Sequence, residues 1–290
     1  MNKLDINTAI KKVSEGVASL ETSDSWLTYL TFCSRFYNYS YNNIILILMQ
    51  QPNASYVASY STWRKMNRYP RRDEKGIAIL CPIFKRIEVI KESSNTRIYN
   101  DKEAEKEVKT LLSGFRIGYV FDISQTDGDD SMLPVLVKGL AGNSNEEKAL
   151  YEALFKYVSS KHCVQEVTGI SAKGSYNIET KVISIRSDLE YRQKLKSLAH
   201  EFFHLKDFEM NPDLNIPRNK RELLAESCSY VLCLRLGVDV SDYSFGYIKS
   251  WLKEPKELGE IADSVQKIIS NTFHELAESE DFAFSHLLED

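Results

Sequence analysis

The chain has 290 residues and carries 41 acidic against 37 basic side chains, a formal net charge of −4. This length is enough for one large domain or two ordinary ones, and the acidic balance argues against nucleic-acid binding over the whole surface. The five scattered cysteines are typical of reduced thiols, not of a disulfide framework. Residues 1–6 lack the pattern of a signal peptide, and no apolar run approaches a membrane span. We therefore expect a cytoplasmic protein without a membrane partner.

Three sections follow one another along the chain. Residues 1–123 mix helical patterns with strands, the clearest of which are at 76–81 and 118–123. Residues 124–145 are rich in Asp, Ser and Gly, the composition of a linker. Residues 146–290 show helices around one short pair of strands. The expected fold class is α+β in two domains, an N-terminal α+β domain and a mainly helical domain with a small sheet.

The first section is basic although the whole chain is acidic. Cations that track phosphates, together with aromatic rings on which bases stack, are typical of proteins that bind single-stranded nucleic acid. We therefore predict a single-stranded nucleic acid as partner. The predicted contact residues are Tyr39, Tyr41, Trp63, Arg64, Lys65, Arg68, Arg71, Arg72 and Lys75, and the basic run continues to Lys85 and Arg86. The alternative is a solvated basic face with the aromatic side chains buried behind it.

Residues 200–204 read His-Glu-Phe-Phe-His, the H-E-x-x-H arrangement. Residues four apart on a helix share one face, so His200 and His204 can bind one metal ion while Glu201 takes a proton from water on that ion. Ser187–Glu190 has the form of a capping box that would start this helix. The alternative is a core helix with two incidental histidines, against which Glu201 argues because a carboxylate is costly in a dry core.

A catalytic zinc ion takes three protein ligands and keeps one position for water, so two histidines leave it one ligand short. Glu222 and Glu226 lie four residues apart on one face of the next predicted helix. We assign Glu222 as the third ligand and Glu226 as the group that orients a ligand imidazole. The reverse assignment stays open because spacing does not rank the two acids. A solvated charged face beside Arg221 is the alternative for both.

These residues predict hydrolysis of a peptide bond with one zinc ion per chain. Metal-bound water would lose a proton to Glu201 and attack a polarised carbonyl, and Glu201 would pass the proton to the leaving amine. Residues 174–178 and 181–186 read as two short strands, and an edge strand there can align a peptide by main-chain pairing. Tyr176 and Tyr191 are the candidates for stabilising the oxyanion.

Several segments together resemble the ArdC-type antirestriction family carried by plasmids and integrative elements. These segments are 39–43, 51–58, 63, 74–79, 120–126, 198–201 and 221–226. The resemblance implies a single-stranded DNA-binding domain at 1–123, the linker at 124–145, and a zincin-like metallopeptidase domain at 146–290. It implies a metal site at His200, His204 and Glu222 with Glu201 as base. This chain has Asp73 where members of the family usually have Gly.

Three functions agree with the sequence. The first is a zinc peptidase that a single-stranded DNA-binding domain brings to its place of action, against an unknown protein substrate. The second is a DNA-binding, protective protein whose metal site is structural or idle. The third is a peptidase that cleaves a repressor or restriction subunit and uses the basic section to dock on protein.

Overall fold

The computed structural model describes residues 5–90, 106–131, 133, 144–238, 240 and 255–288. The helices are α1 (Ile6–Ala18), α2 (Ser23–Arg35), α3 (Tyr41–Gln50), α4 (Tyr60–Lys65), α5 (Ser144–Ser159), α6 (Tyr191–Met210), α7 (Arg218–Arg235) and α9 (Pro255–Ala277), with short 3-10 helices at Ser19–Glu21, Ile123–Gln125 and Ser285–Leu287. The strands are β1 (Val57–Ser59), β2 (Arg68–Pro70), β3 (Ile77–Ile90), β4 (Lys106–Asp122), β5 (Thr126–Gly128), β6 (Cys163–Val167), β7 (Gly174–Tyr176) and β8 (Val182–Arg186). This mixture of helices and sheets confirms the α+β class. Within the described ranges, no helix is long and apolar enough to span a membrane.

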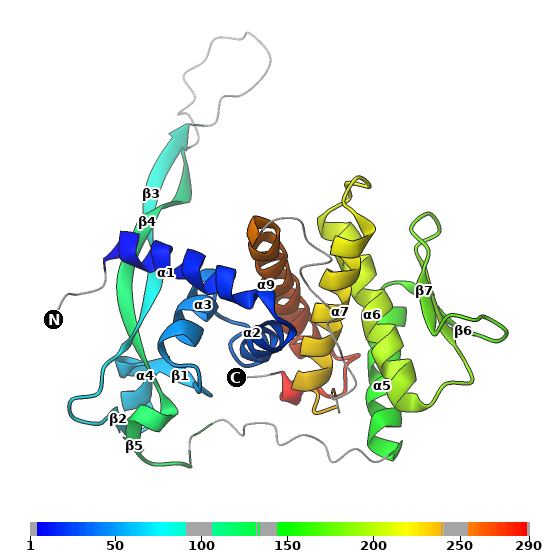
Figure 1. The fold of residues 1–290 in the computed structure, drawn as a ribbon, viewed down its shortest axis with the longest axis horizontal. Coiled ribbons are helices and arrows are strands. Elements are labelled where there is room, and N and C mark those ends of the chain that lie inside the picture. Colours follow the sequence, from blue (N-terminus) through cyan, green and yellow to red (C-terminus); the bar gives the residue numbers. More distant parts are fainter. Residues whose placement is uncertain are drawn as a thin grey trace, which may run out of the picture.

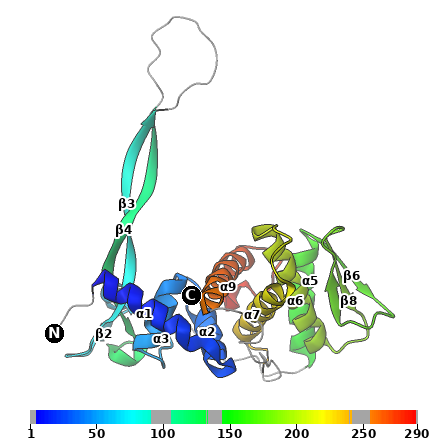
Figure 2. The same ribbon diagram turned by 45° about the horizontal axis from the view of Figure 1, so that its top comes forward.

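The N-terminal sheet has the strand order β1-β4-β3, and its two long strands form an arm. Both predicted strands are confirmed, and both are longer than predicted. They pair antiparallel from Ile77 and Val120 to Ile90 and Lys106, with a bulge after Ile83. The base of the arm packs on α3, whose Asn43 amide bonds both main-chain groups of Leu80 at 3.0 and 2.8 Å. The rest of the arm extends away from the body of the protein (Figures 1 and 2).

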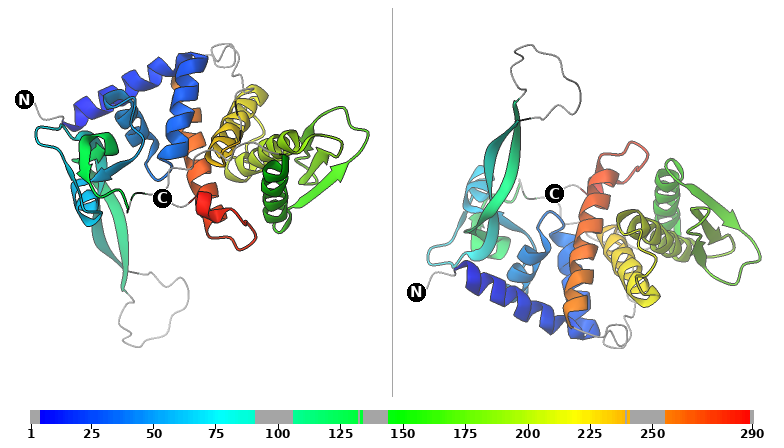
Figure 3. Two further views of the ribbon diagram at one scale, coloured as in Figure 1. Left: turned by 90° about the horizontal axis from the view of Figure 1, so that it is seen from below. Right: turned by 90° about the horizontal axis from the view of Figure 1, so that it is seen from above.

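One hydrophobic core joins the N-terminal helices to the C-terminal ones. The indole N–H of Trp26 on α2 donates to the hydroxyl of Ser227 on α7 at 3.0 Å, and the Tyr29 hydroxyl donates to the carbonyl of Ala262 on α9 at 2.8 Å. Figure 3 shows α2, α7 and α9 gathered at the centre of the molecule. The predicted domain boundaries therefore separate sections that share a core. Residues 134–143 of the predicted linker lie outside the described residues.

The C-terminal part places a small sheet against α6. The predicted pair is present as β7 and β8, which are antiparallel, while β6 was not predicted and pairs parallel with β8. The predicted capping box is wrong, because α6 begins at Tyr191 and its N-cap is Glu190. The main-chain N–H of Ser187 donates instead to the carbonyl of Val167 at 2.9 Å, so Ser187 continues the sheet.

Candidate metal centre

Helices α6 and α7 pack against each other and bring three of the predicted site residues together. Nε2 of His200 and Nε2 of His204 are 3.1 Å apart. Oε2 of Glu222 lies 3.4 Å from the first nitrogen and 3.5 Å from the second. Nitrogen and oxygen ligands at about 2.1 Å from a tetrahedral zinc ion stand about 3.4 Å apart. The two imidazoles and the carboxylate therefore have both the chemistry and the spacing of a three-ligand metal site.

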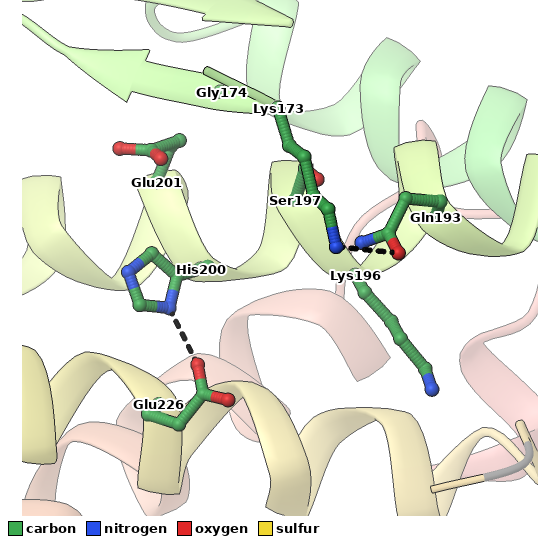
Figure 4. A pocket seen from close by; sticks show the side chains of 8 residues that line it. All are labelled: Lys173, Gly174, Gln193, Lys196, Ser197, His200, Glu201 and Glu226. Carbon is green, nitrogen blue, oxygen red and sulfur yellow. Dashed lines mark hydrogen bonds and ion pairs between the residues drawn. The ribbon is translucent and has the colours of Figure 1, made fainter. Parts of the chain in front are cut away.

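The two acids of α7 have different partners. Glu226 does not face the gap between the imidazoles, because its Oε2 lies 2.8 Å from Nδ1 of His200. Figure 4 shows Glu226 reaching up from α7 to this ring. A carboxylate on Nδ1 holds the proton there and leaves Nε2 as the electron-pair donor toward a metal. The geometry favours Glu222 as ligand and Glu226 as the orienting residue.

Opposite charges surround the two imidazoles. Burial alone would lower the pKa of His200, but hydrogen bonds to the carboxylates of Glu222 and Glu226 outweigh it and raise that pKa to about 10. Hydrogen bonds from His200 and then His204 hold the pKa of Glu222 well below its usual range. A metal ion at this place would replace the imidazole proton as the positive charge that the carboxylates neutralise.

Glu201 lies between the metal-site residues and the edge of the small sheet. Its burial raises the pKa of its carboxyl, and the neighbouring His200 and His204 act in the opposite direction. A Cβ atom on Gly174 of β7 would come within 2.9 Å of the Glu201 side chain, so only glycine allows this close approach. Glu201 is thus held beside the site with a carboxyl whose pKa is raised by burial.

Two cavities share Gly174, His200 and Glu201 in their lining. The smaller, of about 350 Å³, is polar and includes Lys173, Gln193 and Ser197 (Figure 4). The larger, of about 670 Å³, is lined on one side by Tyr176, Ile178, Phe208, Leu214 and Ile216. A polar pocket and a more apolar pocket therefore meet at Glu201. Tyr191, the other oxyanion candidate, is not among the residues that line either cavity.

Arg221 has a structural role that the sequence did not reveal. The alternative of a solvated charged face is wrong for Arg221, because this side chain is buried against the Asp207 carboxylate of α6. Its guanidinium also donates to the carbonyls of Asn211 and Asp213 at 3.0 and 2.7 Å and lies 3.8 Å from the Phe208 ring centroid. Arg221 thereby ties the end of α6 and the following turn to α7. No spacing rule links it to an acid fourteen residues earlier.

The comparisons with known proteins agree with the resemblance of the N-terminal part to the ArdC-type antirestriction family. The N-terminal domain of the anti-restriction factor ArdC matches residues 5–121. This part of the chain is therefore similar to the N-terminal domain of ArdC. An uncharacterized protein of Bacillus anthracis is 25% identical over 88% of this chain. That match covers 47% of the relative, so the chain spans about half the length of this relative.

Two crystal structures of the antirestriction protein ArdC from plasmid R388 are also similar to this chain. The metal-free structure is 20% identical, with a TM-score of 0.45, and the match covers 80% of this chain and 82% of that one. The Mn(II)-bound structure is 18% identical with the same TM-score of 0.45, and the match covers 85% and 96%.

Within the ArdC-type part, two predicted DNA contacts are wrong. Trp63 is fully buried, and its indole N–H donates to the carbonyl of Phe121 at 2.8 Å. Arg68 is also buried, where it bonds the carbonyl and hydroxyl of Thr126 at 3.1 Å and pairs with Asp130. Both side chains fasten α4 and β2 to the neighbouring strands. The alternative of aromatic side chains buried behind a basic face is therefore correct for Trp63.

The side chains of the other predicted DNA-binding residues differ in their exposure to solvent. Tyr39 and Tyr41 are half-buried, and burial together with the Asp263 charge raises the pKa of Tyr41 to about 12. The Arg71 guanidinium forms ion pairs with Glu74 at 2.7 Å and with Asp127 at 3.3 Å. Arg64, Lys65, Arg72 and Lys75 are exposed, as is the paired Arg71.

At Asp73, where members of the family usually have Gly, the backbone keeps a conformation that favours glycine. Asp73 has a φ of 69°, in the left-handed region that favours glycine, and Asp is one of the few side chains that tolerate it. The substitution therefore preserves the turn before β3 and adds a negative charge to it.

Proposed function

We propose that this chain is an antirestriction-type protein that binds single-stranded DNA and hydrolyses peptide bonds at a zinc site. The observation that carries the peptidase proposal is the triangle of His200, His204 and Glu222 donor atoms, with sides of 3.1, 3.4 and 3.5 Å. A glutamate beside the first of two histidines four apart is the arrangement of a metal-dependent hydrolase.

Each residue of the centre has a defined task in this proposal. His200 and His204 would hold the ion through Nε2, and Glu222 through Oε2. When bound, the ion supplies a polarised carbonyl and a water molecule of lowered pKa. Glu201 would accept a proton from the attacking water and return it to the leaving amine, a double task that its burial-raised pKa supports.

The edge strand β7 supports a peptide as substrate. Main-chain bonds at Lys173 and Asn177 point toward β8, so by alternation the main-chain groups of Gly174 and Tyr176 point away from it. On this edge the main-chain N–H of Tyr176 donates to the Glu201 carboxylate, and Gly174 lines both the polar and the more apolar pocket. An extended peptide pairing with β7 would run past the Glu201 carboxylate.

The DNA-binding part of the proposal is supported by the exposed cations of the ArdC-type section. Arg64, Lys65, Arg72 and Lys75 all reach solvent. Lysine and arginine side chains that contact phosphates make binding strongly dependent on salt. Single-strand binding that falls steeply with added salt would support DNA as the partner and oppose a basic surface that docks only on protein.

The proposal is tested by metal analysis, peptide cleavage and single-strand titration on the wild type and on Glu201→Gln. We expect about one zinc ion per chain in both proteins, because Glu201 is not a ligand. Cleavage of a peptide library, read by mass spectrometry, should be lost in Glu201→Gln while DNA binding is kept. A folded wild type that takes up no metal would overturn the peptidase proposal. Unchanged antirestriction in Glu201→Gln would favour the binding protein with an idle site.

A further inference from the structure

The β3–β4 arm has an exposed surface that the metal centre does not use, and the predicted basic run ends on it at Lys85 and Arg86. Its strands have 14 and 17 residues, so at about 3.3 Å per residue the arm is about 45 Å long. Its base packs on α3, and the rest of it projects from the body of the protein (Figure 2). Apolar side chains on such an extension cost free energy unless a partner covers them.

Three aromatic side chains lie on one face of this arm. Pro82 is paired with Phe115, Phe84 with Leu112, and Ala78 with Tyr119. Directly paired residues share a face and alternate residues of a strand return to it, so Phe84, Phe115 and Tyr119 form one row. Their exposed fractions are 60%, 40% and 44%. Large rings this open to solvent along a single face are available for stacking.

The arm is also locally basic. Lys85, Arg86, Lys109 and Arg116 are exposed, and there is no acidic residue at 77–87 or 109–121, the stretches of the arm whose side chains are described. These four positive charges contrast with the net charge of −4 for the whole chain. A second copy of the same arm would therefore repel this one, whereas a polyanion would be attracted.

The aromatic row continues toward the exposed cations at the base of the arm. A Cβ atom on Gly76 would lie 3.0 Å from Cβ of Tyr119, so Tyr119 sits directly beside the main chain at Gly76. The exposed Lys75 precedes that glycine. Cations thus occur at both ends of the row of rings.

We propose that the β3–β4 arm is a binding surface for single-stranded DNA, with bases stacked on Phe84 and Phe115 and phosphates held by Arg86 and Lys75 at the two ends of the row. Positive charge along a backbone path, combined with aromatic rings, is the recognition mode of single strands. This inference rests on the proposed DNA binding and assigns its principal surface to the arm, in place of the buried Trp63 and Arg68.

The test is a fluorescence titration of the full chain with labelled oligo-dT at several salt concentrations. Phe84→Ala/Phe115→Ala should bind at least tenfold more weakly, since each stacked base contributes about 1–3 kcal/mol. Phe84→Leu/Phe115→Leu should also lose most of this affinity, because leucine stays apolar but has no aromatic face. The matched control is Ile87→Ala/Leu111→Ala, which removes two exposed apolar side chains from the opposite face and should bind like the wild type.

Each contrary outcome has a distinct meaning. If the wild type binds oligo-dT and both phenylalanine pairs bind equally well, the arm is not the contact surface, although the proposed DNA binding stands. If the wild type does not bind, the DNA-binding proposal itself fails. Equal affinity for oligo-dT and for its duplex with oligo-dA would overturn base stacking. A wild-type dimer that only the phenylalanine variants dissociate would assign the arm to a second copy.

Discussion

The carboxylate of Glu226 accepts a hydrogen bond from Nδ1 of His200 at 2.8 Å, and Nε2 of the same ring lies 3.4 Å from Glu222. One imidazole thus separates two glutamates that are a single helical turn apart on α7. The acid on Nδ1 orients the ring, whereas the acid near Nε2 shares with it the place of a metal ion. The two glutamates should therefore differ in how their removal changes metal affinity.

Glu226→Ala should weaken zinc binding about 10- to 100-fold, because it removes an orienting hydrogen bond but leaves three ligands. Glu222→Ala should cost more, since it deletes a ligand. Competition with a chromogenic zinc chelator measures both. A larger loss in Glu226→Ala than in Glu222→Ala would mean that the two roles are reversed.

His200→Ala should abolish stoichiometric metal binding without unfolding the chain. His200 lies at the rim of the cavities and is partly exposed, so its truncation leaves the core intact. Metal content by mass spectrometry and the far-UV circular dichroism spectrum give the two readouts. Retention of one metal ion per folded chain in this variant would place the metal elsewhere.

Arg221→Met should destabilise the fold by about 3–5 kcal/mol, because it leaves the buried Asp207 carboxylate without its cation. The matched control is Arg218→Met, three residues earlier on α7. Arg218 is 93% exposed and lies 3.2 Å from Glu222, so this change should cost at most about 1 kcal/mol. Urea unfolding of both variants measures the difference. Equal stabilities would show that the Arg221–Asp207 pair has no net effect.

Ser227→Ala should destabilise the fold by about 1–3 kcal/mol, since the buried indole N–H of Trp26 loses its acceptor. Because this contact joins α2 to α7 within one core, tryptophan fluorescence and circular dichroism should report a single unfolding transition that shifts as a whole. Ser264→Ala on α9 is the control, because its hydroxyl bonds an exposed carbonyl of its own helix. Two separate transitions would support sections that fold independently.

The cysteines should react with a thiol reagent at pH 8 at very different rates. Burial raises the pKa of the Cys33 thiol to about 12 and raises that of Cys228 well above its usual value, so both stay protonated and unreactive in the native chain. Cys163 is exposed and should react first. Cys163→Ser should remove the fast phase of the reaction. Rapid modification of Cys33 would instead reveal local opening of the core.

Much of the metal centre was predictable because its main spacing is local. The distance between residues four apart is set by the helix itself, so His200 and His204 could be paired before any tertiary contact was known. The strands at 76–81 and 118–123 were recognised for the same kind of reason. The strand β6 was missed because its mostly exposed residues do not alternate between apolar and polar.

The sequence alone determined the pair of histidines, the neighbouring glutamate, the candidate acids on the next helix and the presence of a basic N-terminal section. Tertiary structure alone decided that Glu222 faces the histidines while Glu226 reaches Nδ1, because that depends on how α7 is rotated against α6. It also decided that Trp63 and Arg68 are buried while Phe84 and Phe115 are exposed. Composition records which charges and rings a segment contains, but only packing between distant elements determines which of them meet solvent.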